Sequence, residues 1–332
     1  MRPPLLHRRC PELVGSLPFL RLGAAPTPVR ALPGAGTRAE LWVKDESGYG
    51  DGGWGGNKVR KLEWLLPEAR RRGARTLLTV GGLGTNWGLA AARYAREQGL
   101  EVVLGLIDHP VDEHVRGQLE RLRASGASLH FPRTKTRLMV AAPWLFVRHF
   151  HGATPPYYLP AGGSSPLGAL GAVEIALELG AQVEAGELPE PAWLVTPVGS
   201  GGTTAGLALG LRLAGLRTRV LGVVVNDTLR LDSRALLALA RRSAALLRAR
   251  GADVTGAVPG PDAVRVETAW LGDGYAHPTA AGDRALALAS ARTGLTLERT
   301  YTAKAFAALL ALDARGGLAG GPVVFLQTHG PR

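Results

Sequence analysis

Cysteine is almost absent from this chain of 332 residues, because Cys10 is the only one. A single cysteine forms neither an internal disulfide nor a cysteine metal cluster, so we expect no metal site and a reducing, cytoplasmic location. No apolar run approaches the roughly 20 residues that span a bilayer. The first residues also lack a continuous apolar segment with a cleavage signal. We therefore expect neither a membrane partner nor secretion.

Aromatic residues are scarce too, at 6%, although the formal net charge is +12. Nucleic-acid binding favours basic side chains that are concentrated in one segment and interleaved with aromatic rings for stacking. Here the arginines are spread over 70–72, 116–123, 230–250 and 284–299. We interpret most of them as solvated helix faces and expect no nucleic-acid partner.

Lysine is the rare basic residue, since the 39 basic residues include only Lys44, Lys58, Lys61, Lys135 and Lys304. Lys58 ends the run Gly52-Gly53-Trp54-Gly55-Gly56-Asn57-Lys58, and the apolar residues after it recur at helical spacing. The partial positive charge of a helix N-terminus disfavours a protonated amine, so Lys58 is a candidate nucleophile. Taken alone, the run favours a flexible loop with a solvated lysine.

Short apolar runs alternate with helical patterns along the chain. Strands are predicted at 41–44, 76–80, 102–107, 129–131, 193–196, 220–225 and 323–326. One helix is predicted to begin at Lys58 and another to end at about Gln98. Further helices are predicted over 112–125, 166–179 and 229–250. This alternation predicts βαβ units and open parallel sheets, and a proline-glycine hinge follows at 155–163. The length and the 46% hydrophobic content suit two domains or one large α/β unit.

A second glycine-rich loop, Gly199-Ser200-Gly201-Gly202-Thr203-Thr204, follows the strand at 193–196. Its small residues and the helix behind it offer backbone N–H groups to a phosphate at the carboxyl end of a strand. It lacks the Gly-Lys-Ser/Thr of a nucleotide P-loop, and Thr204 replaces the last small residue of the dinucleotide fingerprint. Asp227 could still serve as a ribose-binding acid, so a nicotinamide-dependent oxidoreductase stays open, as does a plain strand-to-helix turn.

A phosphate cradle and a helix-start lysine in one α/β chain indicate a phosphorylated aldehyde cofactor, which describes pyridoxal 5'-phosphate. Residues 55–63, Gly-Gly-Asn-Lys-Val-Arg-Lys-Leu-Glu, resemble the cofactor-lysine segment of the 1-aminocyclopropane-1-carboxylate deaminase and D-cysteine desulfhydrase family. This family belongs to the tryptophan synthase β-like fold type II. The resemblance continues in order at 81–86, 160–171, 198–206, 274–275, 301–304 and 326–330.

The resemblance implies two open, twisted parallel-sheet α/β domains with the cofactor in the cleft between them. Together with the hinge, it predicts a larger cofactor-binding domain of residues 1–50 and 160–332 and a smaller α/β domain of residues 51–159. It also implies a homodimer.

The family's site residues carry over to matching positions. The resemblance implies that Lys58 forms the Schiff base beside Asn57, and that Asn86 contacts the cofactor's phenolic oxygen. The predicted phosphate ligands are Gly199, Ser200, Gly201, Gly202 and Thr203. Thr85 and Asn86, with Trp87 beside them, would receive the substrate. Tyr275 and Tyr301 would flank the ring or move protons, and Thr302 or Thr328 would meet the pyridine nitrogen. The predicted catalytic residues are Lys58, Thr85, Tyr275 and Tyr301.

Three departures from the family's substrate loop bear on specificity: Gly84, Thr85 and Trp87 replace a glutamine, a serine and a polar residue. They predict a less polar pocket. Thr302 stands where the cyclopropane deaminases have a glutamate, and a neutral partner of the pyridine nitrogen favours elimination.

We therefore predict a lyase or deaminase that removes the Cα proton of a small amino acid and eliminates its β substituent, giving a 2-oxo acid and ammonia. A β-replacement enzyme, a racemase and a silent binding module are the alternatives.

Overall fold

The computed structural model describes residues 3–50 and 55–329. Gly52, Gly53 and Trp54 of the first glycine run lie outside the described residues, as does Gly330 of the C-terminal motif. The strands are β1 (Val29–Ala31), β2 (Leu41–Asp45), β3 (Thr76–Gly82), β4 (Glu101–Ile107), β5 (Ser128–Arg133), β6 (Tyr157–Leu159), β7 (Trp193–Val198), β8 (Arg219–Val224), β9 (Val264–Glu267) and β10 (Val323–Gln327). The helices are α1 (Leu5–Arg9), α2 (Asn57–Arg71), α3 (Asn86–Glu97), α4 (Glu113–Ala124), α5 (Lys135–Arg148), α6 (Leu170–Glu184), α7 (Gly202–Leu213), α8 (Ser233–Ala249), α9 (Ala280–Thr293) and α10 (Thr302–Ala314).

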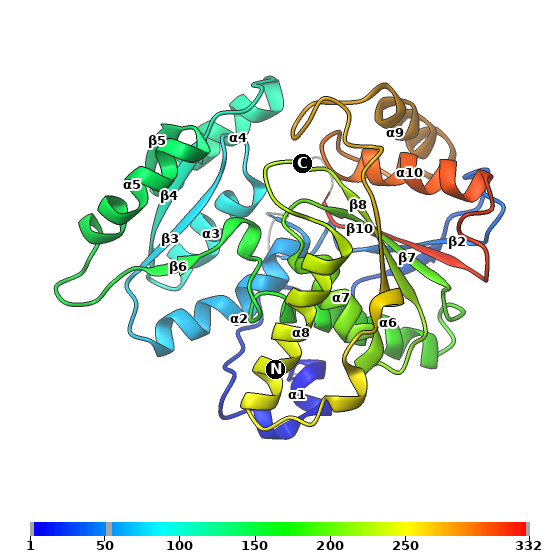
Figure 1. The fold of residues 1–332 in the computed structure, drawn as a ribbon, viewed down its shortest axis with the longest axis horizontal. Coiled ribbons are helices and arrows are strands. Elements are labelled where there is room, and N and C mark those ends of the chain that lie inside the picture. Colours follow the sequence, from blue (N-terminus) through cyan, green and yellow to red (C-terminus); the bar gives the residue numbers. More distant parts are fainter. Residues whose placement is uncertain (1–2, 51–54, 330–332) are drawn as a thin grey trace.

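The strands form two sheets that lie side by side (Figure 1). The larger sheet has the order β1-β2-β10-β7-β8-β9, and only its edge strand β1 runs antiparallel to its neighbour. The smaller sheet has the order β5-β4-β3-β6 and is parallel throughout. The predicted α/β architecture with two open parallel-sheet units is confirmed.

The larger sheet is buried on both faces, as its continuous apolar strands require. On β10, Val323 and Phe325 pack against α9 and α10, while Val324 and Leu326 point to the opposite face and pack against α6 and α7. Helices therefore cover both sides, which leaves the ends of the strands as the places where polar groups can gather.

The smaller sheet is covered unequally. On β3, Leu77 joins the extensive core formed with α2 and α3. The next residue, Leu78, faces α5 and shares a buried cluster there with only Val103 and Leu145. The face under α5 is consequently the less densely packed one.

The predicted strands are all present, with ends that differ by up to two residues. Helix α6 begins at Leu170 rather than at 166, and α1, α5, β1, β6 and β9 were not predicted. Helix α5 carries Pro143 in its interior and apolar residues on several faces, so it lacks a clear amphipathic period. Within the described residues, no helix is both long and apolar enough to cross a membrane. The division into 1–50 with 160–332 and 51–159 stays a prediction.

Candidate active site

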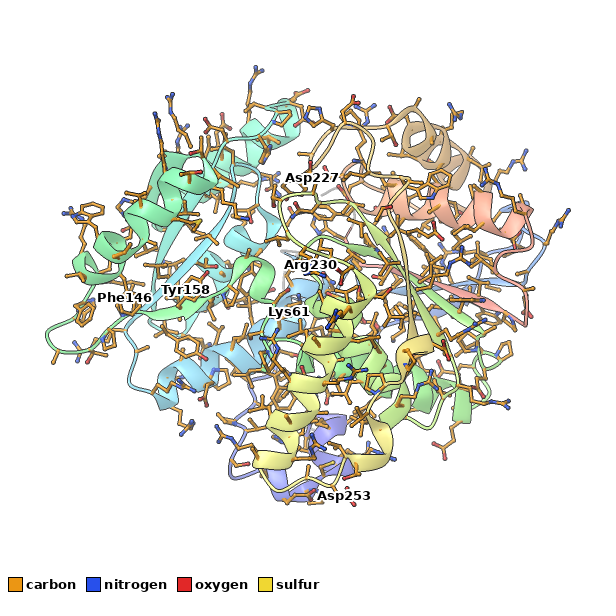
Figure 2. All side chains as sticks on the ribbon, in the orientation of Figure 1. Lys61, Phe146, Tyr158, Asp227, Arg230 and Asp253 are labelled. Atoms are coloured by element: carbon orange, nitrogen blue, oxygen red, sulfur yellow. The ribbon has the colours of Figure 1, made fainter. Side chains whose placement is uncertain are left out.

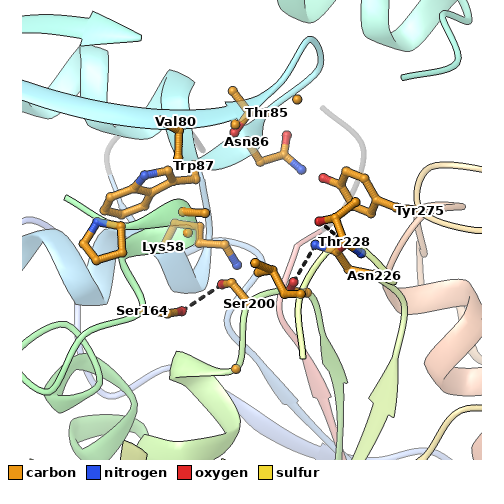
Figure 3. A pocket seen from close by; sticks show the side chains of 18 of the residues that line it. Lys58, Val80, Thr85, Asn86, Trp87, Ser164, Ser200, Asn226, Thr228 and Tyr275 are labelled. Atoms are coloured by element: carbon orange, nitrogen blue, oxygen red, sulfur yellow. Dashed lines mark hydrogen bonds between the residues drawn. The ribbon is translucent and has the colours of Figure 1, made fainter. Parts of the chain in front are cut away.

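A cavity of about 590 Å³ lies between the two sheets, where their strands end. Its walls include Val80 of β3 and Ile107 of β4 on one side, and Pro197 of β7 and Asn226 after β8 on the other. Open α/β sheets bind ligands beyond the carboxyl ends of their strands. Figure 3 shows that Lys58 lies in the middle of this cavity.

The end of β10 positions the start of α2. The backbone N–H of Asn57 donates to the carbonyl oxygen of Thr328 at 3.1 Å. Gly56, with φ +50°, precedes it, and a Cβ there would clash with the same carbonyl oxygen. A glycine at this position is thus required for the strand end and the helix start to meet, and this contact sets Lys58 at the cavity wall.

A buried ion network anchors α2 two residues beyond Lys58. The guanidinium of Arg60 is fully buried, and its Nε donates to Glu46 Oε2 at 2.9 Å. Its other nitrogens donate to Glu178 on α6 at 2.5 and 2.9 Å. Because removal of one member would leave buried charges unpaired, this network holds α2 against α6 and β2 in a single position.

The surroundings of the Lys58 amine favour its neutral form, which is the nucleophilic one. Its Nζ donates to Asn57 Oδ1 at 3.0 Å. Removal from water lowers the pKa of Lys58 to about 8, and the nearby Glu298 carboxylate opposes this shift. Glu298 is held in place by the backbone N–H groups of Thr300 and Thr302, at 2.9 and 2.8 Å. The amine is therefore partly neutral near physiological pH.

The loop from Gly199 to Thr204 has the properties of an anion cradle. The backbone N–H groups of Ser200 and Gly201 donate no hydrogen bond within the described part of the chain. Gly201, with φ +86°, is the N-cap of α7, so the positive end of that helix points at the loop. The hydroxyl of Thr204 also faces this region, and it is buried without a partner.

Residues from two other segments fix this loop. Ser164 Oγ donates to Ser200 Oγ at 2.8 Å and accepts the N–H of Gly202 at 2.9 Å. Asn226 Nδ2 donates to the carbonyl oxygen of Gly199 at 2.8 Å. Of the predicted phosphate ligands, Gly199, Ser200, Gly201 and Thr203 line the cavity, whereas Gly202 does not, because its N–H is used by Ser164.

Asn57 links the lysine to the loop. While its Oδ1 accepts from Lys58, its Nδ2 donates to Thr203 Oγ1 at 3.0 Å. One amide side chain thus spans the distance between the amine and the anion cradle, and it fixes their relative positions.

A second buried amine, that of Lys61, lies beside the loop. Its Nζ donates to the carbonyl oxygen of Gly162 at 2.9 Å, and a Cβ added to Gly202 would lie only 2.9 Å from it. Burial and the Lys58 charge lower the pKa of Lys61 well below its usual range. No role for Lys61 was predicted from the sequence, although its spacing of three from Lys58 places both on one helix face.

The start of α3 forms the cavity wall on the side of the smaller sheet. Thr85 caps this helix, since its Oγ1 accepts the N–H of Gly88 at 3.1 Å. Asn86 lines the cavity as well, and its Oδ1 accepts from Gln118 Nε2 at 2.6 Å. The two residues predicted to receive the substrate therefore stand together at a helix N-terminus, which suits a carboxylate.

Trp87 presents its indole to the cavity. Its Nε1 donates to Thr79 Oγ1 at 2.8 Å, so the polar edge of the ring is satisfied within the protein. Its opposite edge packs against Gly163, where a Cβ would lie only 2.6 Å away. The indole is fixed with its polar group turned away, which leaves an apolar surface.

Tyr275 and Tyr301 meet across the cavity, with their hydroxyl oxygens 2.5 Å apart. Burial raises the pKa of Tyr275, and burial together with Tyr275 raises the pKa of Tyr301 well above its usual range. Both phenols stay protonated, so they can donate protons. Asp227, the candidate ribose-binding acid, instead accepts the backbone N–H of Tyr275 at 3.2 Å.

The two threonines predicted near a ring nitrogen differ in position. Thr302 is fully buried, its Oγ1 accepts the N–H of Glu298 at 2.8 Å, and it does not line the cavity. Thr328 does line it. Ser164, Asn226, Lys61 and Glu298 belong to the site by contact, and none of them was predicted from the sequence.

Known proteins resemble this chain in sequence and in fold. The sequence profile of the family described as "pyridoxal-phosphate dependent enzyme" matches residues 20–328. A D-cysteine desulfhydrase of Salmonella newport is 31% identical over 321 residues, which cover 94% of each chain. The solved structure of a homologue of ACC deaminase superposes with a TM-score of 0.81 at 26% identity and covers 99% of this chain and 95% of its own. The processed form of a threonine deaminase from Solanum lycopersicum has a TM-score of 0.64 at 14% identity, with 99% of this chain and 85% of its own covered.

Proposed function

This chain belongs to the family of pyridoxal-phosphate dependent enzymes and has its type II fold, and we propose from this premise that it is an amino-acid lyase. It would remove the Cα proton of an amino acid and eliminate the β substituent, giving a 2-oxo acid and ammonia. The similarity to D-cysteine desulfhydrase supports elimination, and the predicted D-cysteine-like or cyclopropane amino acid substrates come from the same resemblance.

The main support for the proposal is that one side chain, that of Asn57, contacts both the Lys58 amine, whose pKa is lowered, and Thr203 of the anion cradle. The residues present fit the cofactor. Lys58 offers an amine to its aldehyde, and Ser200 and Gly201 offer free backbone N–H groups to its phosphate. A bound phosphate would favour the protonated form of Lys61, which lies beside the loop, and Thr328 would face the ring nitrogen. When bound, the cofactor supplies an electron sink for the charge left at Cα.

The chain's own residues account for binding and proton transfer. The N-terminus of α3, with Thr85 and Asn86, holds the substrate carboxylate. Lys58 accepts the Cα proton, because an amine with a pKa of about 8 is a competent base near neutral pH. Tyr301, paired with Tyr275, donates a proton to the departing group or to the product carbon, since both phenols are neutral.

Visible absorbance tests the cofactor assignment. The purified protein should show the band of the lysine-bound cofactor, and Lys58→Ala should lose it. Lys135→Ala is the matched control, because Lys135 also lines the cavity but its Nζ donates to the carbonyl oxygen of Thr228 at 3.0 Å. An unchanged band in Lys58→Ala would remove the basis of the proposal.

Product analysis separates elimination from the two alternatives. With D- and L-cysteine, β-chloroalanine and the cyclopropane amino acid, a lyase releases a 2-oxo acid and ammonia. A β-replacement enzyme requires a second nucleophile, and a racemase interconverts the enantiomers without release of ammonia. Turnover of any of these excludes a silent binding module.

We also propose a homodimer in the cytoplasm. The exposed apolar side chains Val140, Trp144 and Val147 on α5 support association, since an exposed apolar patch often marks an interface. The single cysteine supports a reducing compartment. Light scattering on wild type and Trp144→Arg would test the dimer, with a monomeric wild type as the contrary result.

A further inference from the structure

One side of the cavity extends beyond the residues that a small amino acid would need. We call this side the apolar arm, and it is lined by Leu78, Val80, Ile107, Leu138, Ala142 and Leu145. These residues come from β3, β4 and α5, so the arm runs between the smaller sheet and α5. Figure 3 shows Val80 and Trp87 on one side of Lys58, at the inner end of the arm.

The side chains around the inner end of the arm have no polar atom to spare. Trp87 Nε1 donates to Thr79 Oγ1, and that hydroxyl donates to the carbonyl oxygen of Leu159 at 2.8 Å. At the far end, Tyr158 is 51% exposed and marks the approach to solvent (Figure 2). Between these two ends, a polar substituent would lose its water and meet only apolar side chains, whereas an apolar substituent would gain from burial.

The outer wall of the arm can move at low cost. The fully buried contact between helix α5 and the smaller sheet is small: it consists of Leu78, Val103 and Leu145, with the half-buried Leu138, Ala141 and Phe146 packed against them. Met139, which also lines the cavity, is 67% exposed. A segment with few buried contacts opens locally with a small free energy. The packing between α5 and the smaller sheet can therefore adjust to a group that enters the arm.

We propose that this arm binds an apolar group carried on the β sulfur of the substrate, so that the chain cleaves S-alkyl or S-aryl cysteines. The inference rests on the proposed function and specifies its substrate class. Lys58 takes the Cα proton, the Cβ–S bond breaks, and its electron pair leaves with sulfur, which is protonated to a thiol. The remaining enamine is hydrolysed by one water molecule to pyruvate and ammonia, which balances the reaction without an oxidant or reductant.

A homologous series of substrates tests the arm. S-methyl, S-propyl and S-butyl cysteine, each as D and L isomers, should show kcat/KM rising about fourfold for each methylene that the arm buries. The 3-(alkylthio)propanoates lack the amine and cannot react, so their dissociation constants provide a readout besides activity. Calorimetry on the holoenzyme should show the same trend in affinity.

A filled arm provides the second test. Ala142→Phe should lower kcat/KM for S-butyl cysteine by roughly tenfold or more while cysteine itself is little affected. Ala287→Phe is the matched control, because it makes the same change at an exposed position of α9 outside the cavity. Both variants should keep the visible band of the bound cofactor, which reports an intact site.

The outcomes separate this inference from the proposed function. Turnover of cysteine or β-chloroalanine with a flat or falling S-alkyl series would overturn the apolar arm alone. Equal losses on long and short substrates in Ala142→Phe would do the same. If no amino acid in the set were turned over, the proposed function and this inference would fail together.

Discussion

The pH dependence of cofactor capture by Lys58 follows directly from its position. Only the neutral amine attacks an aldehyde, and burial lowers the pKa of Lys58 from 10.5 to about 8. At pH 7 about 9% of the amine is then neutral, compared with about 0.03% for an ordinary lysine. We expect capture of pyridoxal phosphate to be faster than for a solvated lysine at that pH, by up to the roughly 300-fold ratio of the two neutral fractions.

The rate of cofactor capture should rise with pH. As the pH rises, the neutral fraction grows about tenfold per unit below pH 8 and levels off above it. The assay uses cofactor-free protein mixed with pyridoxal phosphate at pH values between about 6 and 10, with the adduct trapped by hydride and located by mass spectrometry. The rate constant should follow a single titration with its midpoint near 8.

Glu298→Gln provides the directional control. The Glu298 carboxylate raises the pKa of Lys58, so its neutral amide should move the midpoint below that of the wild type. Glu184→Gln makes the same change on the exposed end of α6 and should leave the midpoint in place. A midpoint near 10.5 in the wild type, or a rate independent of pH, would refute the role of desolvation at Lys58.

Three further predictions concern the residues around the amine. Arg60→Met should lower the free energy of unfolding by about 3–5 kcal/mol in a denaturant titration. Arg71→Met should lower it far less, because the Arg71 side chain is half exposed and its partner Glu68 keeps its bond to Arg72. Gly201→Ala should cost at least about 1–2 kcal/mol, because the left-handed backbone is strained and the new Cβ would lie 2.6 Å from Leu236 Cδ2, and it should also weaken cofactor affinity. Gly186→Ala, with φ +74° and no atom within 4 Å, should show the strain alone. Tyr301→Phe should lower kcat about a hundredfold with cofactor affinity unchanged, and an unaltered kcat would exclude it from proton transfer.

The sequence predicted those features that have a local signature. The Lys58 segment and the Gly199 loop each combine glycines with a helix start, and both meet in one cavity. The sequence could not select Ser164, Asn226 or Glu298, because each acts through contacts with residues that lie far away along the chain or in another loop. A serine or asparagine in a loop has the same local pattern whether or not it holds a phosphate cradle.

The specificity of the site was the least predictable part for the same reason. Trp87 indicated a less polar pocket, but the structure shows that its apolar face results from a hydrogen bond to Thr79 on a different element. Helix α5 closes the arm beyond Trp87. This helix was not predicted, because Pro143 and the apolar residues on its outer face remove the amphipathic pattern. Chemistry at Lys58 depends on short segments marked by glycines, whereas substrate choice depends on how β3, β4 and α5 pack together. Changes in α5 can consequently alter the substrate without any change in the residues that bind the cofactor.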